Sequence, residues 1–129
     1  MDSIYLTEVT KIGPEVAELL EEAGTLILFE EGAPPELAEM SVLHEHTERR
    51  DEPPEVGDVM VIGDREFRIT AIGESAWKNM LQLGHASFKF NGAEEVELPG
   101  EICLEGAGSE DIVESIQPGI RVEIKAAAD

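Results

Sequence analysis

Two of the three histidines in this chain, His44 and His46, are separated by a single residue. They fall in residues 41–47, where apolar and polar side chains alternate as they do in a half-buried β-strand. Side chains two residues apart in a strand lie on the same face, with Cα atoms roughly 6–7 Å apart. Two imidazoles that point toward one place suit either a phosphoryl group or a metal ion.

A phosphoryl group needs only one of these histidines as its acceptor. A neutral imidazole nitrogen is a nucleophile near neutral pH, because the ordinary pKa of histidine is about 6.5. The second histidine can donate a hydrogen bond to the phosphoryl oxygens, and a third group must hold the far ring nitrogen in the right tautomer. The phosphohistidine formed in this way has a high transfer potential, so it suits a relay.

A metal ion asks for more ligands than the histidine pair provides. Zinc binds imidazole nitrogens at about 2.0–2.1 Å and takes a third and a fourth ligand, for which His85 or Glu48 is available. The His-x-His spacing is similar to the first motif of the cupins. Their second motif is missing, however, because Pro99 and Gly100 are adjacent and no histidine follows His85. A metal site on His44, His46 and His85 is therefore the alternative reading.

The elements that would position these residues are short and mostly extended. The Gly63-Asp64 pair predicts a two-residue type II′ turn between two strands. Residues 14–24 and 75–84 have helical apolar spacing and end on a glycine, and a further helical turn falls within residues 30–40. The remaining predicted elements are a short helix at residues 109–116 and strands at residues 3–12, 25–29, 41–47, 58–62, 65–72, 85–90, 96–104 and 119–126.

These elements predict a mainly β protein. Short strands with turn signals at close intervals are typical of a small closed or partly open antiparallel β-barrel, here with two or three short peripheral helices. The length of 129 residues fits one domain covering residues 1–129. No βαβ rhythm and no internal repeat is apparent in the sequence.

The charge balance excludes two classes of partner. Nine basic against 29 acidic residues give a formal charge of −20, which argues against binding nucleic acid or docking on an anionic membrane. A single cysteine, Cys103, excludes an internal disulfide. The sequence has no signal-peptide pattern and no apolar run of membrane-spanning length, so we expect a cytoplasmic protein with no direct membrane insertion.

The same acidity indicates a salt-loving source. Self-repulsion at this charge destabilises a small compact domain, and salt relieves the repulsion by shortening the Debye length from about 10 Å at 0.1 M to about 3 Å at 1 M. We therefore expect a halophilic protein.

Short sequence words along almost the whole chain resemble one known family, the glucitol/sorbitol-specific IIA component of the phosphoenolpyruvate-dependent sugar phosphotransferase system (PTS). The residues that carry the resemblance are Ile27-Leu28-Phe29, Glu31-Gly32-Ala33-Pro34, Glu36-Leu37-Ala38-Glu39, His44 and His46, Val56-Gly57, Ile62-Gly63, Ile69-Thr70-Ala71-Ile72-Gly73, Asn79, Leu81, Leu83-Gly84-His85, Phe90, Gly92, Leu98-Pro99-Gly100, Gly106 and Pro118-Gly119.

The resemblance implies a small β-barrel and a role as a phosphocarrier. In this family the first histidine of the pair, here His44, accepts a phosphoryl group from the phosphocarrier protein HPr. It passes the group to a cysteine on the IIB domain of a sorbitol permease, which works with the membrane component IIC. Such a chain is catalytic only as a covalent relay, and the resemblance implies no cofactor. We expect His46 and His85 to orient the phosphoryl group.

Two other functions stay open at this point. The domain could be a stand-alone module that binds a metal or a metabolite through His44, His46 and His85. It could also be purely an assembly partner. Strand alternation places Glu48 and Arg50 on the histidine face, where Glu48 would repel a phosphoryl group and Arg50 would attract one.

Overall fold

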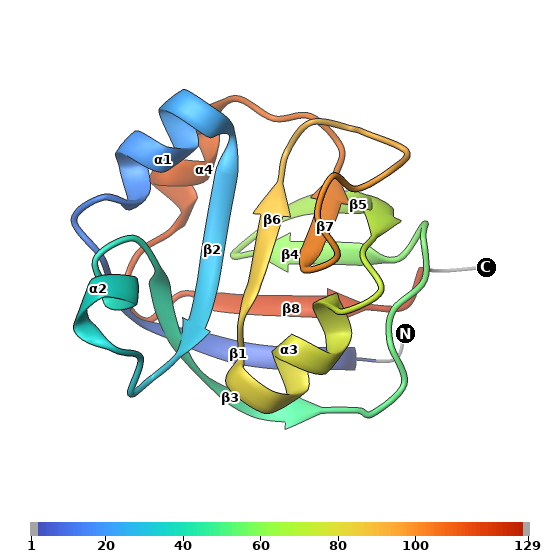
Figure 1. Ribbon diagram of the computed structural model, residues 1–129, viewed down its shortest axis with the longest axis horizontal. Helices are drawn as coiled ribbons and strands as arrows, with labels where there is room; N and C mark the ends of the chain where they lie inside the picture. Colours follow the sequence, from blue (N-terminus) through green and yellow to red (C-terminus); the bar gives the residue numbers. More distant parts are fainter. Residues whose placement is uncertain (1–2, 128–129) are drawn as a thin grey trace.

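The computed structural model describes residues 3–127. Over these residues the chain forms eight strands and four short helices (Figure 1). The strands are β1 (Ser3–Ile12), β2 (Thr25–Glu30), β3 (Val42–Arg49), β4 (Val59–Ile62), β5 (Arg65–Ile72), β6 (Ala86–Lys89), β7 (Glu101–Leu104) and β8 (Arg121–Lys125). The helices are α1 (Val16–Ala23), α2 (Pro35–Ala38), α3 (Ala76–Leu83) and α4 (Ser109–Ser115).

Most of the expected elements are confirmed. The hairpin β4–β5 closes through Gly63-Asp64, with Ile62 paired to Arg65. Gly63 has a φ of 63°, and no residue other than glycine has a positive φ among residues 3–127, so the turn needs its glycine at the first central position, as the type II′ turn does. The predicted strand at residues 96–104 is shorter than expected. Only Glu101–Leu104 pairs with neighbours, because Pro99 and Gly100 turn the chain just before it.

The strands close into a barrel in the order β1-β3-β2-β6-β7-β5-β4-β8 (Figure 1). Most neighbours run antiparallel, as expected, but β2 and β3 are parallel, and so are β6 and β7. Between β2 and β3 the chain returns through α2, so that both strands start at the same end of the barrel. The strand alternation could not predict this crossover, because α2 is a single turn.

The barrel interior forms the hydrophobic core, and α1, α3 and α4 add residues to it. Tyr5, Phe88 and Met60 are among its largest fully buried side chains. Cys103 is also buried, and burial raises the pKa of its thiol. Helices α1 and α4 pack side by side at one end of the barrel (Figure 1).

The ring of strands has an internal two-fold order. Exchanging β1 with β5, β2 with β6, β3 with β7 and β4 with β8 gives the same ring read in the opposite direction. The pairing types agree as well: β1–β3 and β5–β7 are antiparallel, while β2–β3 and β6–β7 are parallel. The barrel therefore consists of two similar halves.

Equivalent positions in the two halves lie 60 residues apart. Helix α1 begins at Val16 and α3 at Ala76, and their glycine caps, Gly24 and Gly84, have φ values of 60° and 62°. The correspondence extends to the backbone hydrogen bonds. The N–H of Gly13 donates to Ser41, and the N–H of Gly73 donates to Glu101.

The expectation of no internal repeat is therefore wrong. The side chains of the two halves have diverged. The identical pairs between residues 10–32 and 70–92 are Thr10 and Thr70, Ile12 and Ile72, Gly13 and Gly73, Gly24 and Gly84, and Gly32 and Gly92. The three glycine pairs mark turns and close backbone contacts, which a search for repeated apolar patterns does not detect.

Candidate functional site

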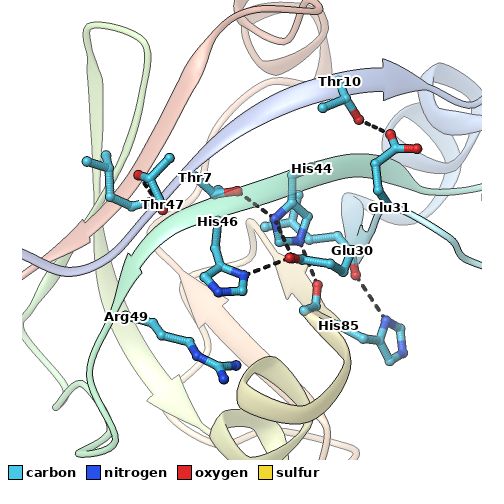
Figure 2. A network of polar contacts seen from close by, with 12 residues as sticks. Thr7, Thr10, Glu30, Glu31, His44, His46, Thr47, Arg49 and His85 are labelled. Carbon is cyan, nitrogen blue, oxygen red and sulfur yellow. Dashed lines mark hydrogen bonds and ion pairs between the residues drawn. The ribbon is translucent and has the colours of Figure 1, made fainter.

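His44 lies inside the barrel. Its side chain is 0% exposed, and both ring nitrogens have hydrogen-bond partners: Nδ1 lies 2.7 Å from Oγ1 of Thr7, and Nε2 lies 2.7 Å from the carbonyl oxygen of Gly84 (Figure 2). A carbonyl oxygen only accepts, so Nε2 carries the proton. Burial lowers the pKa of His44, which keeps the ring neutral. Nδ1 then accepts the hydrogen bond from the Thr7 hydroxyl.

His46 lies nearer the surface on the same strand. Its side chain is 33% exposed, and Nδ1 lies 2.6 Å from Oε1 of Glu30 (Figure 2). A carboxylate only accepts, so Nδ1 carries the proton and the lone pair of the neutral ring is on Nε2. Among residues 3–127, Nε2 has no hydrogen-bond partner. The sequence predicted that one group would fix the tautomer of a histidine, and Glu30 is that group.

Glu30 joins the two histidines. It is the last residue of β2, where the parallel register sets it opposite His44. While Oε1 accepts from His46, Oε2 lies 3.5 Å from Nδ1 of His44 and is buried without a hydrogen-bond partner. A buried carboxylate oxygen with no hydrogen-bond partner is costly for a fold, which makes Glu30 a candidate functional residue.

The lack of a side chain at Gly84 leaves space for the side chain of Glu30. A Cβ atom on Gly84 would lie 2.6 Å from Oε2 of Glu30 and 2.8 Å from its Cβ. The same glycine ends α3 in the left-handed conformation and accepts the hydrogen bond from His44. One backbone position thus contacts both His44 and Glu30.

A β-bulge in β3 determines which charged residue lies on the same side of the strand as His46. Thr7 pairs with His46 and Leu6 with Glu48, so Thr47 is the extra residue in β3. The bulge shifts the alternation by one, and Arg49 lies on the same side of β3 as His46 (Figure 2). The expectation that Glu48 and Arg50 share the histidine face is therefore wrong. Arg50 instead contacts Glu52 and the carbonyl of Pro53.

His85 does not join the histidine pair. Its Nδ1 donates to the carbonyl oxygen of Leu28 at 3.0 Å (Figure 2), and its ring packs against Phe29 with ring centroids 4.9 Å apart. Within residues 3–127, no three histidine, cysteine or acidic side chains are grouped so that they could hold a metal ion. The structure therefore does not favour the metal alternative on His44, His46 and His85.

The second half of the barrel shows what the fold accepts at equivalent positions. Thr7, Glu30 and His44 correspond to Phe67, Phe90 and Leu104, which are all buried and apolar. The rings of Phe67 and Phe90 pack edge to face with centroids 5.2 Å apart. The barrel can fill this place with hydrophobic side chains, so the polar group in the first half is not a requirement of folding.

A comparison with known proteins identifies the family. The family model described as "PTS system glucitol/sorbitol-specific IIA component" matches residues 4–122. The chain belongs to this family. Two glucitol/sorbitol-specific EIIA components, from Shigella flexneri and Escherichia coli K12, are each 35% identical to it over 112 residues, which are 87% of this chain and 89% of each relative.

A solved structure supports the fold of this glucitol/sorbitol-type IIA chain. The crystal structure of a PTS system IIA component from Enterococcus faecalis V583 superimposes with a TM-score of 0.78 and 23% identity. The match covers 94% of this chain and 99% of the E. faecalis chain. No helix within residues 3–127 has the length and apolar character needed to cross a bilayer.

Proposed function

We propose that this IIA chain is a cytoplasmic phosphocarrier of a sorbitol-type uptake system. It accepts a phosphoryl group from HPr on a histidine of the Glu30–His44–His46 group and passes it to a cysteine on the IIB domain of the permease. One observation supports this proposal most: a partly exposed histidine is held by a carboxylate at one ring nitrogen, and its other nitrogen has no hydrogen-bond partner among residues 3–127.

This arrangement suits a relay in both directions. The carboxylate stabilises the positive charge that the ring gains when it takes the phosphoryl group. The N–P bond that forms is weak enough to be broken by a thiolate. Because no proton has to leave the ring, the group can be received and given away by one nitrogen.

The charge of the protein supports rapid encounter with a basic donor. At a net charge of −20 the chain attracts a partner with a positive surface, and the family resemblance implies that HPr has one around its active histidine. In molar salt this attraction is screened, and apolar contacts must hold the complex. Leu83, which is 47% exposed and directly precedes Gly84, is suited to such a contact.

The test is a phosphotransfer assay in low and in molar salt. The protein is mixed with phosphoenolpyruvate, enzyme I and HPr, and the intact mass is measured before and after acid treatment. We expect the mass of one acid-labile phosphoryl group, and its loss on addition of a IIB domain with an intact cysteine. A IIB domain with that cysteine replaced by serine is the control. No mass gain with an active donor would contradict the proposal.

A further inference from the structure

We propose that the outer face of α3 is the docking surface for the IIB domain, which meets it with carboxylates around an apolar centre. This α3 face consists of Lys78, Asn79, Gln82 and Leu83. The inference rests on the phosphocarrier function proposed above and adds where the second partner binds. It holds for either histidine of the pair as the acceptor.

Helix α3 lies in the longest part of the sequence without an acidic residue. The chain has 29 acidic residues, yet none falls between Glu74 and Glu94, and the next longest run without one is residues 115–122. The basic residues between Glu74 and Glu94 are Lys78 and Lys89. Because juxtaposed like charges oppose association, a helix face without carboxylates on a protein of charge −20 is where an acidic partner approaches at least cost.

The first half of the barrel shows that the fold does not require this lack of carboxylates. Helix α1 is equivalent to α3, and both helices have eight residues and end on a glycine in the left-handed conformation. The positions of Lys78 and Gln82 correspond in α1 to Glu18 and Glu22, and all four residues are exposed. Barrel packing therefore does not explain why α3 has a lysine and a glutamine instead.

The outer face of α3 is open to a partner. In the other half, α4 packs against α1 (Figure 1), but the segment equivalent to α4, residues 49–55, contains no helix. Leu83, in the last turn of α3, is 47% exposed. In the first turn, Lys78 has no carboxylate within ion-pair distance among residues 3–127. The α3 face thus offers an apolar side chain at one end and an unpaired cation at the other.

The C-terminal end of α3 borders the histidine group. The carbonyl of Gly84 accepts the hydrogen bond from His44, and Gly84 lies against Glu30. Arg49 of β3 donates to the carbonyl of Leu81, so a second cation lies beside the helix (Figure 2). A protein that covers the histidines and extends along α3 therefore meets cations, amides and an apolar side chain, and the helix gives it no carboxylate.

Charge favours IIB over HPr as the occupant of the α3 face. The family resemblance implies a basic surface on HPr, which Lys78 and Arg49 repel and exposed carboxylates such as Glu31, next to Glu30, attract. Interface centres are depleted in charged residues, and the rest of the α3 face fits such a centre. Leu83 directly precedes Gly84 and is within reach of either partner, so the residues that distinguish the partners are Lys78 and Gln82.

A double variant, Lys78→Glu with Gln82→Glu, tests this surface because it gives α3 the acidic residues that α1 has at the equivalent positions. Two rates are measured in low salt: phosphorylation by HPr, and transfer of the phosphoryl group to IIB. We expect an unchanged rate with HPr and a rate of transfer to IIB that falls about tenfold or more, as electrostatic effects on association do. Molar salt should restore most of the loss, because it screens the repulsion.

Gln117→Glu with Arg121→Glu is the matched control. It changes the net charge by the same amount at two exposed residues outside α3, and circular dichroism checks that both double variants fold. Equal slowing of transfer to IIB in both would show that net charge alone acts. Equal slowing of both steps in the α3 variant would show that HPr covers α3 as well. Either result would overturn the assignment of this surface to IIB.

Direct binding to the unmodified protein gives a measurement that needs no phosphotransfer. The ¹⁵N-labelled chain is titrated with the unlabelled IIB domain and separately with HPr. We expect IIB to shift the backbone amide signals of Lys78, Asn79 and Gln82, and HPr to leave them in place. IIB-induced shifts that spare α3, or no shifts at all, would overturn the inference. Binding of IIB at α3 without any phosphorylation by an active HPr would contradict the phosphocarrier function alone.

Discussion

The Nδ1 atom of His46, within β3, and the Oε1 atom of Glu30, the last residue of the parallel strand β2, lie 2.6 Å apart. Replacing Glu30 with glutamine removes the charge that stabilises the imidazolium and allows the amide to turn its N–H₂ toward the ring. We expect the rate of phosphorylation by HPr to fall about 10- to 100-fold, the range seen when a carboxylate that orients a metal-ligating histidine is lost.

Glu31→Gln is the matched control for this variant. Glu31 is the next residue along the chain, but its carboxylate accepts a hydrogen bond from Thr10 and not from a histidine. Both variants change the net charge equally, so a similar loss in both would show that overall charge and not the Glu30–His46 contact sets the rate.

Arg49 is expected to stabilise the phosphorylated protein. Arg49→Gln should slow phosphorylation and shorten the lifetime of the phosphohistidine, each by about tenfold, because a charge-assisted hydrogen bond to the phosphoryl oxygens is lost. Radiolabelled phosphoryl groups followed over time measure both quantities. Arg50→Gln, at a residue whose guanidinium contacts Glu52 and Pro53, should have little effect. A larger effect at Arg50 than at Arg49 would mean that the strand alternates without the bulge in solution.

Gly84 and Gly24 form a natural pair for a test of the close contact with Glu30. Alanine at either position is strained by the left-handed backbone, by about 1–2 kcal/mol. Only at Gly84 does the new Cβ also meet Glu30; at Gly24 nothing lies within 4 Å. We therefore expect Gly84→Ala to lower both the melting temperature and the phosphorylation rate, and Gly24→Ala to lower the melting temperature alone. Equal phosphorylation rates in the two variants would show that Glu30 tolerates displacement.

The buried His44 makes the stability dependent on pH. Its pKa is lowered in the folded state, so the native ring stays neutral while the unfolded chain takes up a proton near pH 6.5. The contribution of His44 to the free energy of unfolding is complete above about pH 6.5. It is lost as the pH falls below that value, at up to about 1.4 kcal/mol per pH unit. Urea unfolding at pH 7.5, 6.5 and 5.5 in molar salt measures this slope. His44→Leu, which copies Leu104 of the second half, should reduce the slope of the unfolding free energy against pH. An unchanged slope would show that other groups cause the pH dependence.

The acidity predicts a melting temperature that rises from low to molar potassium chloride. Exposed acidic residues repel one another at low ionic strength, and the repulsion is screened in molar salt. A double variant, Glu94→Lys with Glu95→Lys, removes negative charge from an exposed loop. We expect it to raise the low-salt melting temperature and to narrow the gap between the two conditions. Equal melting temperatures of the unmodified protein in low and in molar potassium chloride would contradict the halophilic interpretation.

Local sequence signals predicted most of the strands and helices, but they did not predict how deeply individual side chains are buried in the barrel. The alternation around His44 and His46 correctly set both side chains on one face, and Glu30 contacts both rings. A period of two says which face a side chain takes, but not how far along the strand the barrel interior ends. That is why His44, paired with Val9 inside the barrel, and His46, near its edge, could not be distinguished from the sequence.

The missing parts of the site depend on contacts distant in the sequence. Glu30 reaches the histidines because β2 and β3 are parallel, and a crossover through one helical turn has no clear sequence pattern. Arg49 faces His46 because of the bulge at Thr47, which only the pairing with β1 reveals. The glycine pairs, Gly13 with Gly73 and Gly24 with Gly84, were the available signal for the repeat, at a spacing of 60 residues.

The palindromic strand order has a consequence for how such a barrel can be assembled. The halves join where a strand meets its own counterpart, β2 with β6 and β4 with β8, and through the pairs β1–β8 and β4–β5, which the exchange of halves converts into each other. Two identical half-length chains could close the same ring as a symmetric dimer, and they would carry two equal sites. Fusion into one chain lets the copies diverge: one keeps Thr7, Glu30 and His44, while the other fills the same space with Phe67, Phe90 and Leu104 and serves as the scaffold. This asymmetry suits a relay protein, because with a single site the donor and the acceptor must bind one after the other at the same histidine.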